Sequence, residues 1–150
     1  MRHRNRGRKL NLSPSHRRAL LRALVTALIA HGRIRTTLAR AKEARSLADR
    51  MISLAKDGSL HARRQALETI YEKVVVRKLF EELAGQFRDR SGGYTRIIKS
   101  DCRKGDHASM SLLELTVSRE EKKTRVPKKR PKSPAAGGRE RGKAGSQLAT

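Results

Sequence analysis

Hydrophobic side chains recur at helical spacing in four stretches of this 150-residue chain. In the first stretch, leucine, valine and isoleucine return every three or four positions from Leu20 to Ile29, while arginines lie off that stripe. Ser13 can cap such a helix, Pro14 suits its first position because proline lacks the N–H that would be unpaired there, and Gly32 can end it. The pattern predicts an amphipathic helix between Ser13 and Gly32.

Three more helices are expected from the same spacing. The second follows Thr36–Thr37, either of which can cap it, and ends at Asp57–Gly58. The third is capped by a serine and covers residues 59–70, and the fourth covers residues 72–87. The three valines at residues 74–76 are compatible with a strand, but the apolar positions around them fit a period of about 3.6 better than a period of about 2.

After a polar break at residues 89–93 the pattern changes to β-type alternation. Residues 94–99 and 110–117 are predicted as strands, with the turn-rich link SDCRKGDHAS between them. The β-branched stretch at residues 33–37 predicts an edge strand. Because two strands alone are marginally stable, we expect all three to form one sheet with helices over one face. The expected fold is α/β, of the α+β type, with two layers in the order α-β-α-α-α-β-β.

Positive charge dominates the composition and divides the chain into three parts. The chain has 37 Lys and Arg against 14 Asp and Glu, a formal net charge of +23. Residues 119–150 carry 11 basic and three acidic residues, a net +8, with scarcely an apolar side chain. We therefore predict a basic arm at residues 1–12, a globular domain at residues 13–118, and a disordered, low-complexity basic tail at residues 119–150.

So large a charge opposes folding because the chain repels itself, and its usual reason is a polyanionic partner. We therefore expect a nucleic acid as partner. A membrane partner is not expected, because the longest apolar run is far too short to span a bilayer. No apolar run of a signal peptide follows the charged residues 1–9. The single cysteine cannot form an intrachain disulfide, which favours an intracellular, reducing location.

No catalytic or metal-binding arrangement is predicted. The five histidines lack metal-ligand spacing, and no cysteine pair supports them. Asp101, Asp106 and Glu114 are better explained as turn formers and one exposed strand residue than as a carboxylate cluster. We expect no enzyme activity, cofactor, metal ion or small-molecule substrate.

The N-terminal arm has arginine at every second position. Alternate residues of an extended chain point the same way and lie about 6–7 Å apart, so Arg2, Arg4, Arg6 and Arg8 can follow successive phosphates. Arginine suits this role because its planar guanidinium binds phosphate through two N–H groups and stacks on bases. The alternative, a solubilising tail, would more naturally mix Lys with Glu, Ser and Gln.

Two helices carry further candidate RNA contacts. The first helix begins with basic residues at its positive dipole end, with one more a turn later: His16, Arg17, Arg18 and Arg22. On the second helix, Arg40, Lys42 and Arg45 form a basic face, although Arg45 can instead pair with Asp49 four residues on. Only four aromatic residues are present, and only Tyr94 lies in a predicted strand, so recognition of folded RNA by shape and phosphate fits better than base stacking on a sheet.

Five stretches follow one another along the chain: MRHRNRGRKLN, SHRRALLRALVTALI, HGRIRTTLARAKEAR, DRSGGYTRI and GDHASMSLLEL. In this order and spacing they resemble the bacterial large-subunit ribosomal protein L-seventeen family, over about residues 1–117. The resemblance implies a non-enzymatic, structural protein near the polypeptide exit tunnel, with helices over a small sheet. It also implies that the chain binds large-subunit ribosomal RNA (rRNA) and that its basic arm penetrates this RNA.

The resemblance assigns RNA contacts to the residues that match its motifs. In the arm and at the start of the first helix these are Arg2, His3, Arg4, Arg6, Arg8, Lys9, His16 and Arg17. In the later motifs they are Thr36, Thr37, Arg40, Lys42, Arg90, Tyr94 and Arg96, while Gly92 and Gly93 match the same motifs without an assigned contact. The chain departs from the family pattern at Leu12, where a basic residue is expected, and at Ala23 and Ala44, which replace larger residues. Nothing carries over to the tail.

Two functions remain in view. The leading hypothesis is a structural constituent of the large ribosomal subunit, in the cytoplasm, with large-subunit rRNA and neighbouring ribosomal proteins as partners. The alternative is a DNA-architectural, nucleoid-type protein with basic arms, because KKRPKSP in the tail resembles the DNA-binding tails of linker histones.

Overall fold

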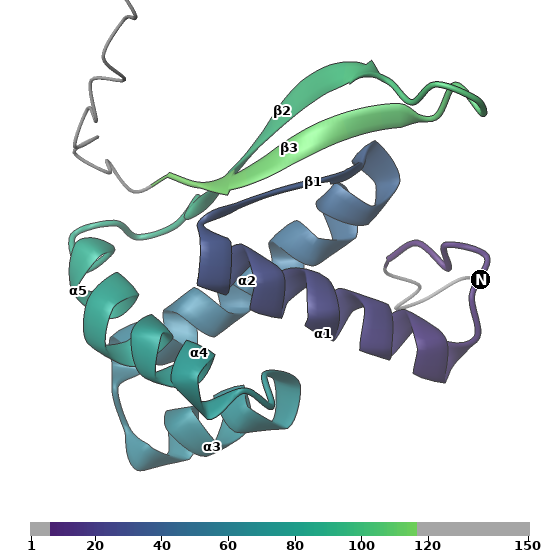
Figure 1. Cartoon of the computed structure of the whole chain (residues 1–150). Coiled ribbons are helices and arrows are strands. Elements are labelled where there is room, and N and C mark those ends of the chain that lie inside the picture. Colours follow the sequence, from purple (N-terminus) through teal and green to yellow (C-terminus); the bar gives the residue numbers. More distant parts are fainter. Residues whose placement is uncertain (1–6, 117–150) are drawn as a thin grey trace, which may run out of the picture. The chain divides into compact units, whose positions relative to one another are not determined.

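A three-stranded sheet with helices on one of its faces forms the fold in the computed structural model, which describes residues 7–116 (Figure 1). The elements are α1 (Pro14–His31), β1 (Arg33–Thr37), α2 (Leu38–Asp57), α3 (Leu60–Thr69), α4 (Lys73–Lys78), η1 (Leu79–Leu83), α5 (Ala84–Gln86), β2 (Thr95–Cys102) and β3 (Ser109–Leu115). The α/β class and the order of elements are those predicted. The predicted tail and the first half of the predicted arm, residues 1–6, lie outside the described residues.

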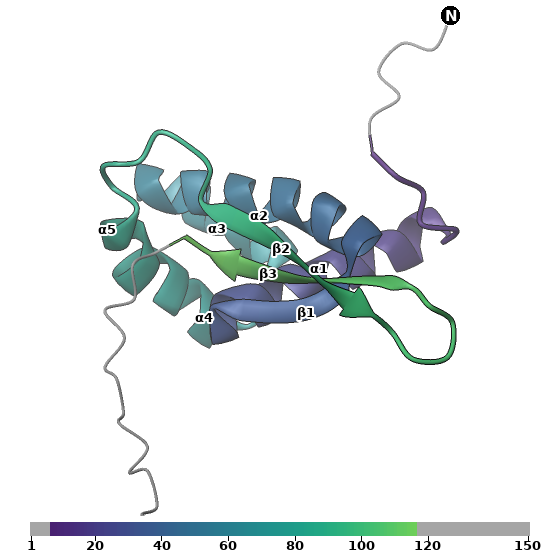
Figure 2. The same cartoon turned by 90° about the horizontal axis from the view of Figure 1, so that it is seen from above.

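The strands form one antiparallel sheet in the order β1-β3-β2, so β3 lies in the middle. Arg33 of β1 lies opposite Glu114 of β3, and Glu114 lies opposite Arg96 of β2. Seen from above, the strands lie in front of the helices, which cover only the far face of the sheet (Figure 2). The prediction that residues 33–37 join the two later strands is confirmed.

Local signals begin the first helix and end the first two. The Ser13 hydroxyl accepts a hydrogen bond from the His16 N–H at 3.4 Å, and Pro14 takes the first helical position, as predicted. Gly32 ends α1 at a φ of 78°, a left-handed conformation that glycine adopts without a Cβ clash, and its N–H donates to the Leu28 carbonyl at 2.7 Å. Gly58 ends α2 in the same conformation.

The predicted fourth helix is present, but its middle turn, η1, is a π-helix between α4 and α5. Four of its buried side chains, Val75, Leu79, Leu83 and Phe87, are spaced four residues apart, and Val76 is buried beside the first of them. On an α-helix this spacing drifts around the axis by about 40° per step. The wider π turn keeps Leu83 and Phe87 on the buried face, which explains why the helical periodicity was recognisable but the turn type was not.

The hairpin of β2 and β3 differs from the prediction. β2 begins at Thr95 and continues through Cys102, so the link covers residues 103–108 instead of 100–109. A register irregularity between Lys99 and Cys102 lets pairing resume within the polar segment. Tyr94 lies one residue before β2, where its carbonyl still accepts the Thr116 N–H at 2.9 Å, and its ring packs edge-on against Phe87, with ring centroids 5.3 Å apart. β3 ends at Leu115, and Val117 lies outside the described residues.

α2 lies at the centre of the core and presents small side chains to its neighbours. Its fully or almost fully buried alanines are Ala41, Ala44, Ala48 and Ala55. Of the two alanines that depart from the family pattern, Ala44 is therefore part of this packing, whereas Ala23 is exposed. Around α2 the core is completed by larger side chains of α1, the fourth helix and the sheet: Val25, Leu28, Ile29, Leu79, Phe87 and Leu113.

Replacing Leu28 by alanine is expected to lower the free energy of unfolding by about 2–5 kcal/mol, because Leu28 is fully buried and the substitution leaves a cavity. The matched control is Leu60→Ala on α3, where the leucine is 64% exposed, and its effect is expected to stay within about 0.5 kcal/mol. Urea unfolding of both full-length variants measures the difference. Equal losses in the two variants would contradict the position of α1 in the core.

Candidate nucleic-acid interface

Three segments that are distant in the sequence meet at the start of α2 and enclose an open cleft of about 430 Å³. We call it the α2 cleft. Its lining comes from the N-terminal segment, the first turn of α2 and the beginning of β3: Arg8, Thr37, Leu38, Ala39, Lys42, Ala108 and Ser109. The structure thus brings together Arg8, Thr37 and Lys42, three of the residues predicted to bind RNA.

The first turn of α2 faces this cleft without a side-chain cap. Ser13 and Ser59 cap α1 and α3 by accepting a backbone N–H, whereas the Thr37 side chain accepts none. The first turn of α2 also contains no acidic residue. Unpaired N–H groups and the helix dipole make such an end attractive to anions, and Arg8 and Lys42 add positive charge beside it.

The segment before α1 is held against α2 by contacts of its first described residues. The Arg8 Nε lies 3.7 Å from a Glu43 carboxylate oxygen. Gly7 has a φ of 85°, and a Cβ at this position would lie 3.1 Å from the other Glu43 oxygen. Leu10 and Asn11 follow in left-handed conformations, and the Leu12 N–H closes the turn on the Lys9 carbonyl at 3.2 Å. Glu43, which only interrupted a basic face in the sequence, therefore positions the end of the arm.

Four arm residues predicted to bind RNA lie outside the described residues: Arg2, His3, Arg4 and Arg6. Lys9 is exposed, and Leu12, the departure from the family pattern, is half-buried. At the start of α1, His16 and Arg18 are exposed and Arg17 is half-buried. The side chains of Lys9, His16 and Arg18 are therefore accessible to a negatively charged partner.

Arg22 is the member of the α1 group that the fold holds in place. Its guanidinium donates to the Tyr71 hydroxyl and lies 5.0 Å from the centroid of the Tyr71 ring. Tyr71 itself is 70% exposed. Nothing in the helical periodicity singled out Tyr71, because its contact with Arg22 joins residues 49 positions apart.

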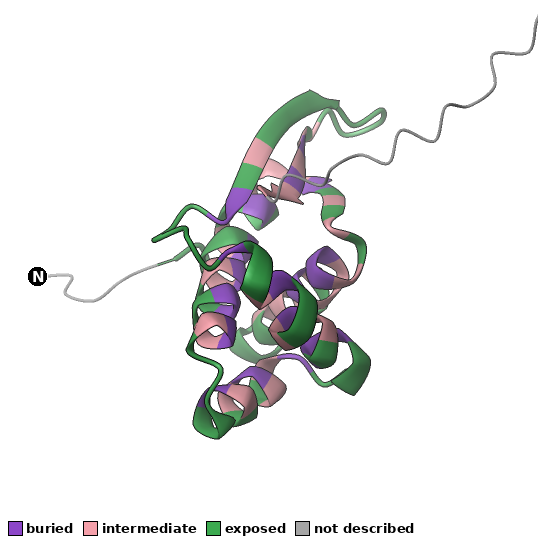
Figure 3. Cartoon of the chain, turned by 90° about the vertical axis from the view of Figure 1, so that its left-hand side faces the viewer, coloured by how far each residue is buried: buried purple, intermediate pink, exposed green. Residues whose placement is uncertain are grey.

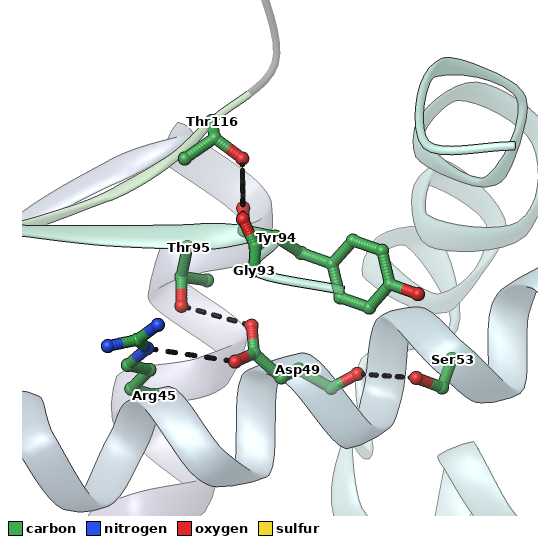
Figure 4. Close-up of polar contacts among 7 residues, drawn as sticks. All are labelled: Arg45, Asp49, Ser53, Gly93, Tyr94, Thr95 and Thr116. Carbon is green, nitrogen blue, oxygen red and sulfur yellow. Dashed lines mark hydrogen bonds and ion pairs between the residues drawn. The ribbon is translucent and has the colours of Figure 1, made fainter. Parts of the chain in front are cut away.

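On α2, Arg40 and Lys42 are exposed, and Arg45 forms the pair with Asp49 that was left open from the sequence. The Arg45 Nε lies 3.8 Å from Asp49, whose other carboxylate oxygen accepts a hydrogen bond from the Thr95 hydroxyl at 3.0 Å (Figure 4). Asp49 therefore ties α2 to the first residue of β2. The Arg45 side chain is still 49% exposed, so this ion pair is weak and leaves the guanidinium accessible.

The residues from the DRSGGYTRI stretch mostly serve the fold. Tyr94 is buried, and Thr36 of the earlier motif is buried as well. The Arg90 guanidinium donates to the Thr116 hydroxyl at 2.7 Å, and that hydroxyl donates to the backbone of Gly93 and Tyr94 (Figure 4). Burial leaves little of the Thr36 and Tyr94 side chains to contact a partner, whereas Arg96 and Thr37 keep accessible surface.

The β2–β3 hairpin ends in an exposed turn (Figure 3). The Arg103 Nε donates to an Asp106 carboxylate oxygen at 2.9 Å, and the same oxygen accepts the Ala108 N–H at 3.3 Å. The hydrogen bond from Arg103 is the main reason that the pKa of Asp106 is lowered to about 2. Asp106 is thus a turn former, as predicted, and it orders the link that leads into the α2 cleft.

The three carboxylates considered from the sequence do not form a cluster in the described part of the chain. Glu114, the strand carboxylate, lies 3.6 Å from the Arg96 guanidinium, far along the sheet from the turn that holds Asp106. Within residues 7–116, no group of three His, Cys, Asp or Glu side chains is placed to hold a metal ion. In the same range no helix combines the length and the apolar character needed to cross a bilayer.

Comparison with known proteins identifies the family of this chain. Residues 20–116 match the family described as ribosomal protein L17. The chain belongs to this family. One relative, from Desulfotalea psychrophila, is 56% identical over 115 residues, which cover 77% of this chain and 89% of the relative. A second, from Geobacter sulfurreducens, is 52% identical over 135 residues, or 90% and 76% of the two chains. Both are named large ribosomal subunit protein bL17.

Membership of the L17 family confirms the resemblance stated from the sequence motifs. The family is one of structural ribosomal components and not of enzymes, in agreement with the expectation. The match to a relative from Clostridium kluyveri is only 108 residues long, yet it covers 96% of that relative. The 135-residue match to the Geobacter protein, by contrast, is longer than the predicted arm and domain together and so includes part of the basic tail.

The Asp106 carboxylate is expected to titrate at a pH of about 2 in the folded chain, followed by NMR of its side-chain carbons. Because the folded pKa lies below the ordinary value of 3.8, ionisation favours the folded turn above that value, and this contribution is lost as the pH falls toward 2. Arg103→Met removes the side-chain hydrogen-bond donor together with its charge and is expected to return the pKa toward 3.8. An unchanged Asp106 titration in this variant would show that Arg103 does not order the turn.

Proposed function

We propose that this chain is a structural constituent of the large ribosomal subunit in the bacterial cytoplasm, where it stabilises folded rRNA through contacts with backbone phosphates. Its family consists of ribosomal proteins, and the relatives described above are large-subunit proteins. A net charge of +23 is usual for proteins with a polyanionic partner, and rRNA is such a partner. Neighbouring large-subunit proteins complete its surroundings.

The α2 cleft is the observation that carries this proposal. One phosphate group in the cleft would accept hydrogen bonds from the uncapped first turn of α2 and lie between the Arg8 and Lys42 side chains. Such a contact reads no base, so it positions the protein on the RNA without specifying a sequence. The twisted surface of a folded rRNA, in which phosphates of several strands come close, fits a cleft built from three separate chain segments.

The remaining proposed contacts lie in the arm, on the helices and at the sheet. In the arm they are Lys9 and the preceding Arg2, His3, Arg4 and Arg6. Along the helices they comprise His16, Arg17, Arg18, Arg22, Arg40 and Arg45. At the sheet they include Arg96 and the Thr37 hydroxyl, with Arg90 near the end of β3. Thr36 and Tyr94 are buried, so we assign them to the support of these surfaces and not to RNA contact.

Sedimentation of cell lysate tests the proposed assembly against the DNA-architectural alternative. We expect the chain to co-sediment with large ribosomal subunits and to remain there at moderate salt, because many phosphate contacts act together. Its recovery with the nucleoid, together with its absence from large subunits, would refute the ribosomal proposal and favour the alternative.

Lys42→Gln tests the α2 cleft. Loss of one phosphate contact should reduce the slope of log affinity for rRNA against log salt by about one unit. The matched control is Lys73→Gln, which removes an exposed lysine at the start of α4, away from the cleft lining. A filter-binding titration across a series of salt concentrations gives both slopes. The same slope in Lys42→Gln and Lys73→Gln would show that the cleft holds no phosphate.

A further inference from the structure

The face of the sheet opposite the helices is open and combines arginines with apolar side chains. On β1, Arg33 and Arg35 are exposed while the intervening Ile34 is half-buried and Thr36 is buried. On β2, Arg96 and Ile98 are exposed on the same face, and Ile98 keeps 42% of its surface. We call this the open face of the sheet; no helix among the described residues covers it (Figure 2).

The register places these side chains in two rows across the three strands. One row is Arg33, Glu114 and Arg96, and the next is Arg35, Leu112 and Ile98. An apolar strip of Leu112 and Ile98 is therefore bordered by arginines on both outer strands. Met110 continues this face on β3 and lies opposite Thr37, a residue of the α2 cleft. The open face is thus continuous with the proposed phosphate site.

The charges on this face are only partly neutralised by the chain itself. Glu114 lies 3.6 Å from Arg96. Among the described residues, neither Arg33 nor Arg35 has a carboxylate within ion-pair distance. Three arginines against one glutamate leave a net positive surface, and successive outward arginines on β1 lie about 6–7 Å apart. This arrangement attracts an anion with repeated charges rather than a single one.

We propose that the open face of the sheet binds a helical segment of the rRNA across its shallow minor groove, which deepens the function proposed above and rests on it. The minor groove of an RNA helix is wide and shallow and displays ribose hydroxyls, so it accepts a flat surface such as a sheet. The apolar strip lies on the sugars while Arg33, Arg35 and Arg96 reach phosphates on either side. Binding of this kind does not require aromatic side chains that stack on bases, as sheets that bind single-stranded RNA do.

Charge argues against the other possible occupants. The chain's own tail, residues 119–150, carries a net +8 from 11 basic and three acidic residues, so the arginines repel it. A second copy of this chain would bring the same arginines against each other. A protein partner would need an acidic, apolar surface, whereas rRNA supplies both the charge and the extent.

The first test is the double variant Arg33→Gln/Arg35→Gln in the full-length chain. If both side chains contact phosphates, the slope of log affinity for rRNA against log salt falls by about 1.4–1.8 units relative to the parent. The matched control is Arg64→Gln/Arg88→Gln, which removes two exposed arginines on the helical side of the fold. Circular dichroism and thermal unfolding of each variant establish that the domain is folded.

The second test identifies what lies on the face in the assembled subunit. Ile98→Cys is introduced into a Cys102→Ser background, so that a short photoactivatable cross-linker can be attached at residue 98 alone. Large subunits containing this protein are expected to yield a covalent adduct with rRNA.

An adduct with a ribosomal protein at residue 98, or no adduct, would overturn the inference. So would a double-variant slope equal to that of the Arg64→Gln/Arg88→Gln control, if the parent chain still binds rRNA and Lys42→Gln still lowers its slope. Failure of the parent chain itself to bind rRNA would instead refute the proposed function, and this inference with it.

Discussion

The fold depends on the packing of α2 against almost every other element. α2 contacts α1, α3, all three strands, η1 and α5. It can do so because alanines at its buried positions, such as Ala41, Ala44 and Ala48, allow close approach without cavities. The direction of this helix also decides where its positive end emerges, beside the start of β3 and the end of the arm. The element that forms the core therefore also creates the α2 cleft.

The second constraint is the repulsion among the many positive charges, which the carboxylates of the chain neutralise only in part. Each of five arginines among the described residues lies near a carboxylate: Arg8, Arg45, Arg77, Arg96 and Arg103. All five arginine side chains are about half exposed or more, so these pairs contribute little to stability and are screened by salt. Two of these pairs instead fix local positions: Glu43 contacts the end of the arm, and Asp106 orders the hairpin turn. The 14 acidic residues of the chain cannot neutralise its 37 Lys and Arg.

Elements whose signals are local were predictable. Ser13, Gly32 and Gly58 act through their own backbone conformation and nearest turns, and the strand at residues 33–37 follows from β-branched residues and alternation. The errors lie where distant contacts override local pattern. Tyr94 was predicted to contact RNA, but its side chain is buried and its ring packs against Phe87. The π turn of η1 follows from the need to keep Phe87 buried, which no single stretch of sequence expresses.

The sequence by itself determined the family and the order of helices and strands, because ordered motifs, capping residues and periodicity need no knowledge of tertiary contacts. Only the tertiary structure decided which cations lie close together. Arg8 and Lys42 line one cleft, together with Ser109, because α2 and the sheet pack on each other. Likewise, the side chains of Thr36 and Tyr94 are buried, whereas those of Arg33 and Arg35 are exposed on the open face. The physical reason is that burial is a property of the packed layers: alternation along a strand separates its two faces, but only the helices decide which face is covered.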